Sequence, residues 1–352
     1  MKLMILDGNS VINRAYFGVK PLTTRDGLYT HAIYGFLNIL ERMEREEQPD
    51  AVCVAFDLHG PTFRHLQYDG YKATRHGMPE ELAMQMPVMK DVLRAMNIPI
   101  YECQGWEADD VIGTVGRICS NNGWECVIVT GDRDSLQLID ENVHIKLVIS
   151  KPGQTTATMY DEAKFREEYG FEPKKLIDLK ALMGDSSDNI PGVAGVGPKT
   201  ATELLIKFGS LDGVYANLED ASIRPKLREK LVAGKENAYL SYELATIRPE
   251  APIDFEPKDA IVMPYDKPAL YELFQKLEFV KLIDKYGLSA PQGAERVVDQ
   301  EACVPECVSE VVTDRERMEE LLAFWRNGCE VNILALPDLN TVCVQWQECA
   351  AL

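Results

Sequence analysis

Three carboxylates fall within four residues of this sequence, at Glu107, Asp109 and Asp110. They stand directly before an apolar run, Val111–Ile118, whose spacing predicts a helix, and Glu107 and Asp110 would share one face of that helix. Acids in the first turn of a helix are stabilised by the helix dipole by about 0.3–1 kcal/mol, so they are common there without any catalytic role. Whether these three belong to a site depends on where the other isolated acids fall.

Three further aspartates follow apolar runs that predict buried strands. Asp7 and Asp57 come directly after their runs, and Asp132 comes one residue after its run. The predicted strands, which are separated by helical patterns, are Lys2–Leu6, Ala51–Phe56, Ile98–Tyr101 and Cys126–Thr130. This alternation predicts an α/β fold, a mostly parallel sheet with helices on both faces, and ligands of such sheets bind at the carboxyl ends of the strands. For each aspartate taken singly, a turn or N-cap role is the alternative.

Gathered at one edge, the acids would form a metal site. The candidates are Asp7, Asp57, Glu107, Asp109, Asp110, Asp132, Asp134, Asp185 and Asp188. So many carboxylates repel one another and raise one another's pKa unless cations neutralise them. Oxygen ligands suit Mg²⁺ or Mn²⁺, and no His or Cys lies among them to favour zinc. Two such ions about 3.5–4 Å apart can activate water and stabilise a leaving oxygen, so the sequence predicts metal-dependent phosphoryl chemistry.

A basic and aromatic segment with no clear period, His59–Met78, supplies complementary groups. Lys72 and Arg75 are three apart, so a helix would direct both to one phosphate, where cations stabilise developing charge. Arg64 adds a further cation, and Tyr71 could stack on an unpaired base. The alternative is an exposed basic loop.

After about Val148 the alternation stops and the chain is predicted to be helical. The helices are predicted at 174–183, 198–208, 235–247 and 267–277. Before the second of them stand Gly195 and Gly197, followed by Pro198, Lys199 and Thr200. This spacing is similar to the hairpin of helix–hairpin–helix modules, which hold the DNA backbone without reading bases. A plain loop is the alternative.

Composition limits the cellular setting. The net charge of −19 argues against broad attraction to nucleic acid, unless many of the acids are gathered in one metal pocket. Nine cysteines at irregular spacing indicate reduced thiols, and Cys303 and Cys307 lack the second pair that a zinc site needs. No apolar stretch approaches the roughly 18 residues of a membrane span, and the N-terminal run is too short for a signal peptide. We therefore expect a cytoplasmic protein without a membrane partner.

Seven motifs in this order resemble one family. They are Leu6-Asp7-Gly8-Asn9-Ser10, Phe56-Asp57, Tyr71-Lys72-Ala73-Thr74-Arg75, Glu107-Ala108-Asp109-Asp110, Thr130-Gly131-Asp132-Arg133-Asp134, Gly184-Asp185-Ser186-Ser187-Asp188-Asn189-Ile190-Pro191-Gly192 and Gly195-Val196-Gly197-Pro198-Lys199-Thr200-Ala201. Residues 1 to about 288 resemble the 5′-nuclease domain of bacterial DNA polymerase I, which is related to phage 5′-exonucleases and flap endonucleases.

The resemblance implies roles for the candidate residues. Asp134, Asp185 and Asp188 would serve a second metal ion, and the other six acids named above would surround the first. Lys72 and Arg75 would contact the reacting phosphate from a helical arch at about residues 59–80, through or under which a single-stranded 5′ end passes. The hairpin at Gly195–Lys199 would hold duplex DNA, in that family often with a bound K⁺.

The resemblance also implies an organisation. Residues 1–172 would be a PIN-like nuclease domain, 173–288 a helix–hairpin–helix-type DNA-binding subdomain, 289–309 a linker and 310–352 the start of a proofreading-like domain. The region 330–336 lacks the Asp-x-Glu pair of active proofreading nucleases, so we expect no proofreading activity. No polymerase domain lies in these residues, although one is expected in cis if the natural chain is longer. A departure from the family is His76-Gly77 after Arg75, where a proline is usual.

The expected function is that of a Mg²⁺-dependent 5′→3′ exonuclease and flap endonuclease, in which Mn²⁺ can substitute. Its expected partners are DNA flaps, nicks and 5′ ends, including RNA-primed ends, in replication and excision repair. Two alternatives are a PIN-type ribonuclease, disfavoured by the hairpin and by Asp185 and Asp188, and a non-catalytic DNA-junction-binding module, which predicts missing acids. A haloacid-dehalogenase-type phosphatase is excluded because Asp7 lacks a second Asp two positions on.

Overall fold

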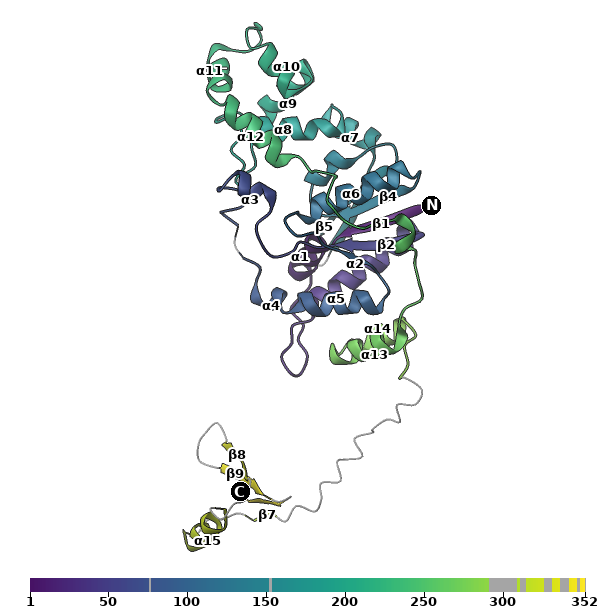
Figure 1. The fold of residues 1–352 in the computed structure, drawn as a ribbon, viewed down its shortest axis with the longest axis vertical. Coiled ribbons are helices and arrows are strands. Elements are labelled where there is room, and N and C mark those ends of the chain that lie inside the picture. The colour runs from purple at the N-terminus through teal and green to yellow at the C-terminus, as the bar shows by residue number, and fades with distance from the viewer. Residues whose placement is uncertain are drawn as a thin grey trace. The chain divides into compact units, whose positions relative to one another are not determined.

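The computed structural model describes residues 1–75, 77–151, 154–290, 309–310, 315–325, 331–335, 342–346 and 349–351. The chain divides into two compact units, Met1–Ser289 and Ala290–Leu352. The first unit contains every residue that the sequence predicts for the site (Figure 1).

A six-stranded sheet forms the centre of the first unit. Its strands are β1 (Lys2–Asp7), β2 (Ala51–Ala55), β3 (Ile100–Tyr101), β4 (Glu125–Thr130), β5 (Val143–Lys151) and β6 (Gln154–Tyr160), in the spatial order β3-β2-β1-β4-β5-β6. All neighbours are parallel except β5 and β6, which form an antiparallel pair. The four predicted strands are confirmed. The expectation that strands end near Val148 is wrong, because β5 continues through Val148 to Lys151 and β6 extends the sheet to Tyr160. The sequence of β6 is polar and threonine-rich and lacks an apolar run.

The central strand β1 is buried on both faces, as a parallel sheet covered by helices requires. Leu3 and Ile5 face one core, and Met4 and Leu6 face the other. The first core includes α6 (Ala108–Asn121), and the second includes α1 (Gly8–Gly18), α2 (His31–Glu47) and α5 (Gln85–Ala95). Figure 1 shows α6 on one side of the sheet and α2 and α5 on the other. The sheet therefore presents the carboxyl ends of β1, β2 and β4 at one edge.

A helical block follows the sheet. It contains α7 (Glu162–Tyr169), α8 (Leu176–Met183), α9 (Pro198–Phe208), α10 (Leu211–Ala216), α11 (Pro225–Ala233) and α12 (Lys235–Ala245). Helix α8 packs against α9, α10 and α12, and its buried residues are continuous with the core on the α6 side of the sheet. The predicted helices at 174–183, 198–208 and 235–247 are confirmed within a few residues.

The last two helices of the first unit do not pack with this helical block. Helices α13 (Lys267–Lys276) and α14 (Val280–Lys285) bury Leu270, Phe274 and Leu282 in the core on the α2 and α5 side of the sheet. The expectation that residues 173–288 form a single helical block is thus wrong for its final part. Their apolar side chains fill the core on the α2 and α5 side of the sheet. Sequence periodicity predicts an apolar helix face, but it does not say which core that face packs into.

Residues 59–80, expected as a helical arch, contain little helix. They hold the five-residue α3 (Phe63–Gln67), a turn through Lys72, and the start of α4 (Glu80–Ala83). Lys72 has a φ of 55°, so Lys72 and Arg75 do not share a helix face as predicted. The departure at His76 lies outside the described residues.

The second unit has a four-stranded sheet in the order β7-β10-β9-β8. Its elements are β7 (Ser309–Glu310), α15 (Arg315–Trp325), β8 (Val331–Ala335), β9 (Val342–Trp346) and β10 (Cys349–Ala351). The predicted linker lies almost entirely outside the described residues. Across the described ranges, no helix combines the length and apolarity needed to cross a membrane. Cys53, Cys103, Cys119 and Cys126 carry free thiols.

Glu44, on α2, lies beside Tyr265 and Tyr286, while its neighbour Glu41 is paired with Lys285. Burial, followed by repulsion from Glu41, raises the pKa of Glu44 from its ordinary value of 4.5 to about 7. Because the folded protein holds this proton more tightly than the unfolded chain, the resulting stabilisation is complete below about pH 4.5. It is lost as the pH rises through about 7.

We therefore predict that Glu44→Gln, which cannot ionise, has a higher free energy of unfolding than the native chain above pH 8, by up to about 3 kcal/mol. Urea denaturation at pH 5 and pH 8 measures the difference. Glu46→Gln is the matched control, because Arg42 and Lys146 lower the pKa of Glu46, so this variant should lose stability at pH 8. A Glu44→Gln effect that is the same at both pH values would contradict the prediction.

Candidate active site

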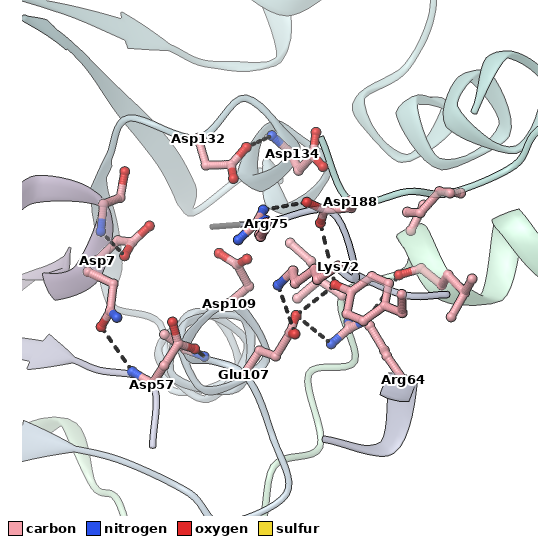
Figure 2. Close-up of a pocket in the computed structure, with 18 of the residues that line it drawn as sticks. Asp7, Asp57, Arg64, Lys72, Arg75, Glu107, Asp109, Asp132, Asp134 and Asp188 are labelled. Carbon is pink, nitrogen blue, oxygen red and sulfur yellow. Dashed lines mark hydrogen bonds and ion pairs between the residues drawn. The ribbon is translucent and has the colours of Figure 1, made fainter. Parts of the chain in front are cut away.

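A cavity with about 240 Å³ of water-accessible space opens at the carboxyl edge of the sheet. Seven of the nine predicted acids line it: Asp7, Asp57, Glu107, Asp109, Asp132, Asp134 and Asp188. Figure 2 shows the carboxylates of Asp7, Asp57, Asp109 and Asp132 around a common space, with Lys72 and Arg64 entering from the side of Glu107. The parallel sheet thus brings together residues that are far apart in the sequence.

Backbone hydrogen bonds fix the first of these aspartates. Asp7 ends β1 and caps α1, since its Oδ1 accepts from the Ser10 amide at 2.9 Å. Its Oδ2 accepts from Thr130 Oγ1, at the end of β4, at 2.8 Å. The same hydroxyl oxygen accepts from the Asp132 amide at 3.0 Å. The ends of β1 and β4 are therefore held in one register by side chains of the site.

Asp57 joins the end of β2 to the start of α6. Its Oδ1 accepts from the Ala108 amide at 2.7 Å, and its own amide donates to Asn9 Oδ1 at 3.0 Å. Glu107 caps α6, which places Asp109 in the first turn, facing the cavity. The N-cap role that served as the alternative interpretation is thus present in the same residues that line the cavity.

Burial and crowding raise the pKa values of several carboxylates in the cavity. Burial raises the pKa of Asp7 to about 7, and the nearby charges of Asp57 and Asp132 add to the rise. Burial and the charges of Asp7 and Asp132 hold the pKa of Asp109 well above its ordinary value. Burial and Asp132 raise the pKa of Asp134 to about 6. A donor set of oxygens alone, with this much unfavourable negative charge, has the chemistry that a hard divalent cation requires.

Several cations of the chain lie among these acids. Lys72 Nζ is 2.8 Å from Glu107 Oε1, and Arg75 pairs with Asp188. Lys180, on α8, pairs with Asp134 at 2.8 Å and also with Asp185. Burial alone would raise the pKa of Glu107, but Lys72 and Arg64 hold it below its ordinary value. The sequence analysis missed Lys180, although its position five residues before Asp185 on a predicted helix was available as a signal.

The carboxylates are spread around the cavity and do not converge on a point. Among the described residues, no three His, Cys, Asp or Glu side chains are close enough to ligate one ion. Like charges separate unless cations lie between them, and here Lys72, Arg75 and Lys180 provide that neutralisation. Holding divalent ions would therefore require these side chains to turn toward them.

Two predicted metal ligands do not line the cavity. Asp110 is fully buried and pairs with Arg64 through both oxygens, at 2.7 and 2.8 Å. Asp185 accepts from the amide and hydroxyl of Ser187, at 2.7 and 2.6 Å, and pairs with Lys180. The structure thus corrects the expected placement of Asp110, whose lone pairs are taken by protein donors.

Two predicted DNA contacts are likewise buried. Arg64 is 2% exposed and Tyr71 4% exposed. Tyr71 donates to Glu107 Oε2 at 3.0 Å, so its ring is not presented as a platform for a base. Both residues nevertheless line the cavity, so their contact with DNA stays a prediction.

The hairpin lies between α8 and α9. Gly192, with a φ of 58°, approaches Gly184 so closely that a Cβ would lie 2.2 Å from the Gly184 nitrogen. This contact closes the loop that carries Asp185 and Asp188. Gly195 has a φ of 77°, and its carbonyl accepts from Lys230 Nζ at 3.0 Å. Gly197 caps α9, and Lys199 and Thr200 follow in its first turn, with Lys199 exposed.

Comparison with known families decides the relationship. A model described as the 5′-3′ exonuclease N-terminal resolvase-like domain matches residues 2–170. A second, the 5′-3′ exonuclease C-terminal SAM fold, matches residues 171–268. The chain belongs to the 5′-3′ exonuclease family. The first model ends close to the predicted boundary at residue 172.

Relatives of this 5′-3′ exonuclease family member include DNA polymerases I. The protein of Caldicellulosiruptor bescii is 45% identical over 289 residues, which are 82% of this chain and 34% of the relative. That of Bacillus subtilis (strain 168) is 38% identical over 313 residues, 89% of this chain and 35% of the relative. The chain therefore spans about a third of the length of these relatives.

Solved structures share the fold. The 5′-exonuclease of phage T5, solved with zinc ions bound, superposes with a TM-score of 0.58 at 20% identity, covering 80% of this chain and 99% of that one. The catalytic core of Rad2, in complex with a DNA substrate, gives a TM-score of 0.55 at 17% identity, covering 81% of this chain and 90% of that one. The expected fold is confirmed.

We predict that Lys180→Met lowers the free energy of unfolding by about 1–3 kcal/mol at low salt, because it leaves the partly buried Asp134 and Asp185 without their shared cation. Added Mg²⁺ should restore part of the loss, since a divalent ion can replace the missing charge. Urea denaturation with and without Mg²⁺ measures both effects.

Lys175→Met is the control for this prediction. The ammonium of Lys175, a partly exposed side chain, lies 3.7 Å from Asp178 Oδ2. Lys175→Met should therefore lower the free energy of unfolding by less than about 1 kcal/mol, and Mg²⁺ should not change this loss. Equal responses from the two variants would show that Lys180 has no special relation to the acids of the site.

Proposed function

We propose that this chain is a divalent-metal-dependent 5′→3′ exonuclease and 5′-flap endonuclease. The observation that supports the proposal most strongly is the cavity itself, where seven carboxylates and the cations Lys72 and Arg75 meet in a member of the 5′-3′ exonuclease family. Carboxylates without His or Cys select hard cations, so Mg²⁺ is the proposed ion and Mn²⁺ a substitute.

The residues divide between two metal positions. Asp7, Asp57, Glu107, Asp109 and Asp132 would hold one ion, and Asp134, Asp185 and Asp188 a second. Such ions, when bound, neutralise the acids and stabilise the negative charge that develops on a phosphate during hydrolysis. The other contributions to the reaction come from the chain's own side chains.

Lys72 and Arg75 are proposed to bind the reacting phosphate. Each is paired with a carboxylate here, Lys72 with Glu107 and Arg75 with Asp188. With metal ions bound, those acids would be neutralised, and Lys72 and Arg75 could turn to phosphate oxygens, where a charge-assisted hydrogen bond is stronger than in water. The Lys72 side chain is partly buried and the Arg75 side chain about half exposed, which suits a site that a single strand enters.

The hairpin and α9 are proposed to hold duplex DNA. Gly195, Gly197 and Lys199 are exposed, as a contact with the DNA backbone requires. Several other cations of the helical block are already paired, such as Lys207 with Asp220 and Arg228 with Glu219. We therefore propose that only a small part of the block's surface contacts DNA. A K⁺ ion at the hairpin is part of the proposal, although the Gly195 carbonyl already accepts from Lys230.

The proposed substrates are DNA with a 5′ flap, a nick or a 5′ end, including RNA-primed ends, in replication and excision repair. The length of the relatives supports a polymerase domain in cis in the natural protein. The bacterial origin of these relatives supports a place in the cytosol with the chromosome. The stretch 310–352 is proposed to begin an inactive proofreading-like domain.

We predict that the chain cuts a 5′-labelled flap duplex near its junction with Mg²⁺ or Mn²⁺, and that EDTA abolishes cutting. Asp109→Asn should lower the rate more than about 100-fold, since even groups that only support metal ligands change activity by 10–100-fold. Asp91→Asn, an exposed acid paired with Arg94, is the matched control and should cut normally. A second flap with an RNA 5′ end tests the primer substrate.

The outcomes separate the alternatives. Cutting that survives Asp109→Asn would place the metal site elsewhere. A wild-type chain that binds the flap in Mg²⁺ without cutting it would be a junction-binding module. Preference for single-stranded RNA over the flap would favour a ribonuclease.

We further predict that Lys199→Ala weakens duplex binding equally for different sequences and reduces the slope of log Kd against log salt by about 1. Fluorescence anisotropy with a labelled duplex measures the slope, and Lys276→Ala, on α13, is the control. Replacing KCl by NaCl at equal ionic strength should weaken binding if K⁺ occupies the hairpin. An unchanged slope for Lys199→Ala would remove this lysine from the DNA contact.

A further inference from the structure

Arg64 lies buried where three distant parts of the chain meet. Its side chain is 3% exposed, and its guanidinium makes five hydrogen bonds, one for each N–H that it carries. They run to the Leu244 carbonyl (3.0 Å), the Thr246 carbonyl (2.7 Å), Glu107 Oε2 (3.2 Å), Asp110 Oδ2 (2.7 Å) and Asp110 Oδ1 (2.8 Å). One side chain of α3 thus ties the start of α6 to the chain that leaves α12.

Asp110 is equally saturated. Besides the two bonds from Arg64, its Oδ1 accepts from the Arg248 amide at 2.9 Å and its Oδ2 from the Glu107 amide at 3.2 Å. Two carboxylate oxygens offer about four lone-pair sites, and all four are used by donors of the protein. The residue is fully buried and does not line the cavity.

The segment 244–248 is fixed to this pair by further contacts. Gln137 donates to the Ala245 carbonyl at 3.0 Å and accepts from the Ile247 amide at 2.9 Å. The Arg248 guanidinium lies over the Phe63 ring at 4.3 Å from its centroid, and Arg64 lies on the same ring at 4.5 Å. The end of α12 therefore has a defined position relative to Glu107.

We propose that Asp110 is not a metal ligand but the counter-ion of Arg64, and that this pair is a positioning element for the site. It orients Glu107, which faces the cavity, and anchors the end of α12, and with it the helical block, to the start of α6. The inference deepens the proposed function and rests on it, because it decides which carboxylates of the motif face the ions and how the DNA-holding block is fixed to them.

The physics of buried ion pairs makes this testable. Removing one partner of a buried pair leaves an uncompensated charge, whereas replacing both partners by neutral groups is tolerated. Arg64→Met would leave Asp110 without a cation and Glu107 with Lys72 as its remaining cationic partner. Asp110→Asn would leave Arg64 with Glu107 as its one acidic partner among these groups. The double variant Arg64→Met/Asp110→Asn is neutral at both positions and keeps an oxygen for the Arg248 amide.

The first measurement is Mn²⁺ affinity by calorimetry, which needs no cleavage. Each single variant should bind Mn²⁺ more weakly, and the double variant should return to within about threefold of the native chain, as expected for two coupled residues. Asp109→Asn, which removes a carboxylate of the cavity, should lose more than about tenfold and should not be rescued by Arg64→Met. A double variant as weak as Asp110→Asn alone would overturn the proposal, because Asp110 would then be a ligand.

The second measurement is amide hydrogen exchange without metal. Protection of residues 63–75 and 244–248 should fall in each single variant and recover in the double variant. Lys146→Met is the matched control, because Lys146 is another buried cation, 2.6 Å from Glu47. This variant should destabilise the fold without changing the Mn²⁺ affinity or the protection of residues 63–75 and 244–248. A single variant that does not fold leaves the double variant and Asp109→Asn to decide.

The two hypotheses fail in different ways. If the native chain does not cut a flap, the proposed function fails while the Mn²⁺ and exchange comparisons still report on Arg64 and Asp110. If it cuts but the double variant shows no recovery in either measurement, the positioning element alone is wrong.

Discussion

Repulsion between carboxylates in one small cavity is the constraint on which the rest of the site depends. A sheet edge that collects Asp7, Asp57, Asp109 and Asp132 would be unstable without positive charge close by. The chain supplies that charge from two separate parts: Lys72 and Arg75 in the segment after α3, and Lys180 on α8. The helical block and the segment after α3 are therefore held to the sheet by the same acids that are proposed to bind metal.

The sequence predicts the sheet-borne part of this site because its logic is local. Asp7, Asp57 and Asp132 each follow an apolar run, and parallel strands bring such positions together whatever the rest of the chain does. Strand β6 was missed because threonines replace the apolar signal. Strand β5 was missed although apolar residues alternate along it, with the paired Lys146 between them. The packing of α13 and α14 was also missed, because an apolar helix face does not specify its partner.

The sequence does not predict in the same way which partners four other side chains take: those of Arg64, Tyr71, Asp110 and Lys180. Their residue types fit either a ligand-binding or a buried role, and the choice depends on partners up to 182 residues away. A cation beside a cluster of acids is attracted to those acids before it meets any phosphate. Motif position alone does not distinguish a carboxylate that faces the cavity from its neighbour that turns inward, as Asp109 and Asp110 show.

The path of the chain through the site has a consequence for its biosynthesis. Asp7 is among the first residues made, but the Arg248 amide that holds Asp110 leaves the ribosome about 240 residues later. Long-range contacts of this kind form late, after loop-closure entropy has been overcome. Nascent and prematurely ended chains would therefore carry most of the acids without the geometry that α12 imposes on them. Such chains are expected to lack the proposed activity.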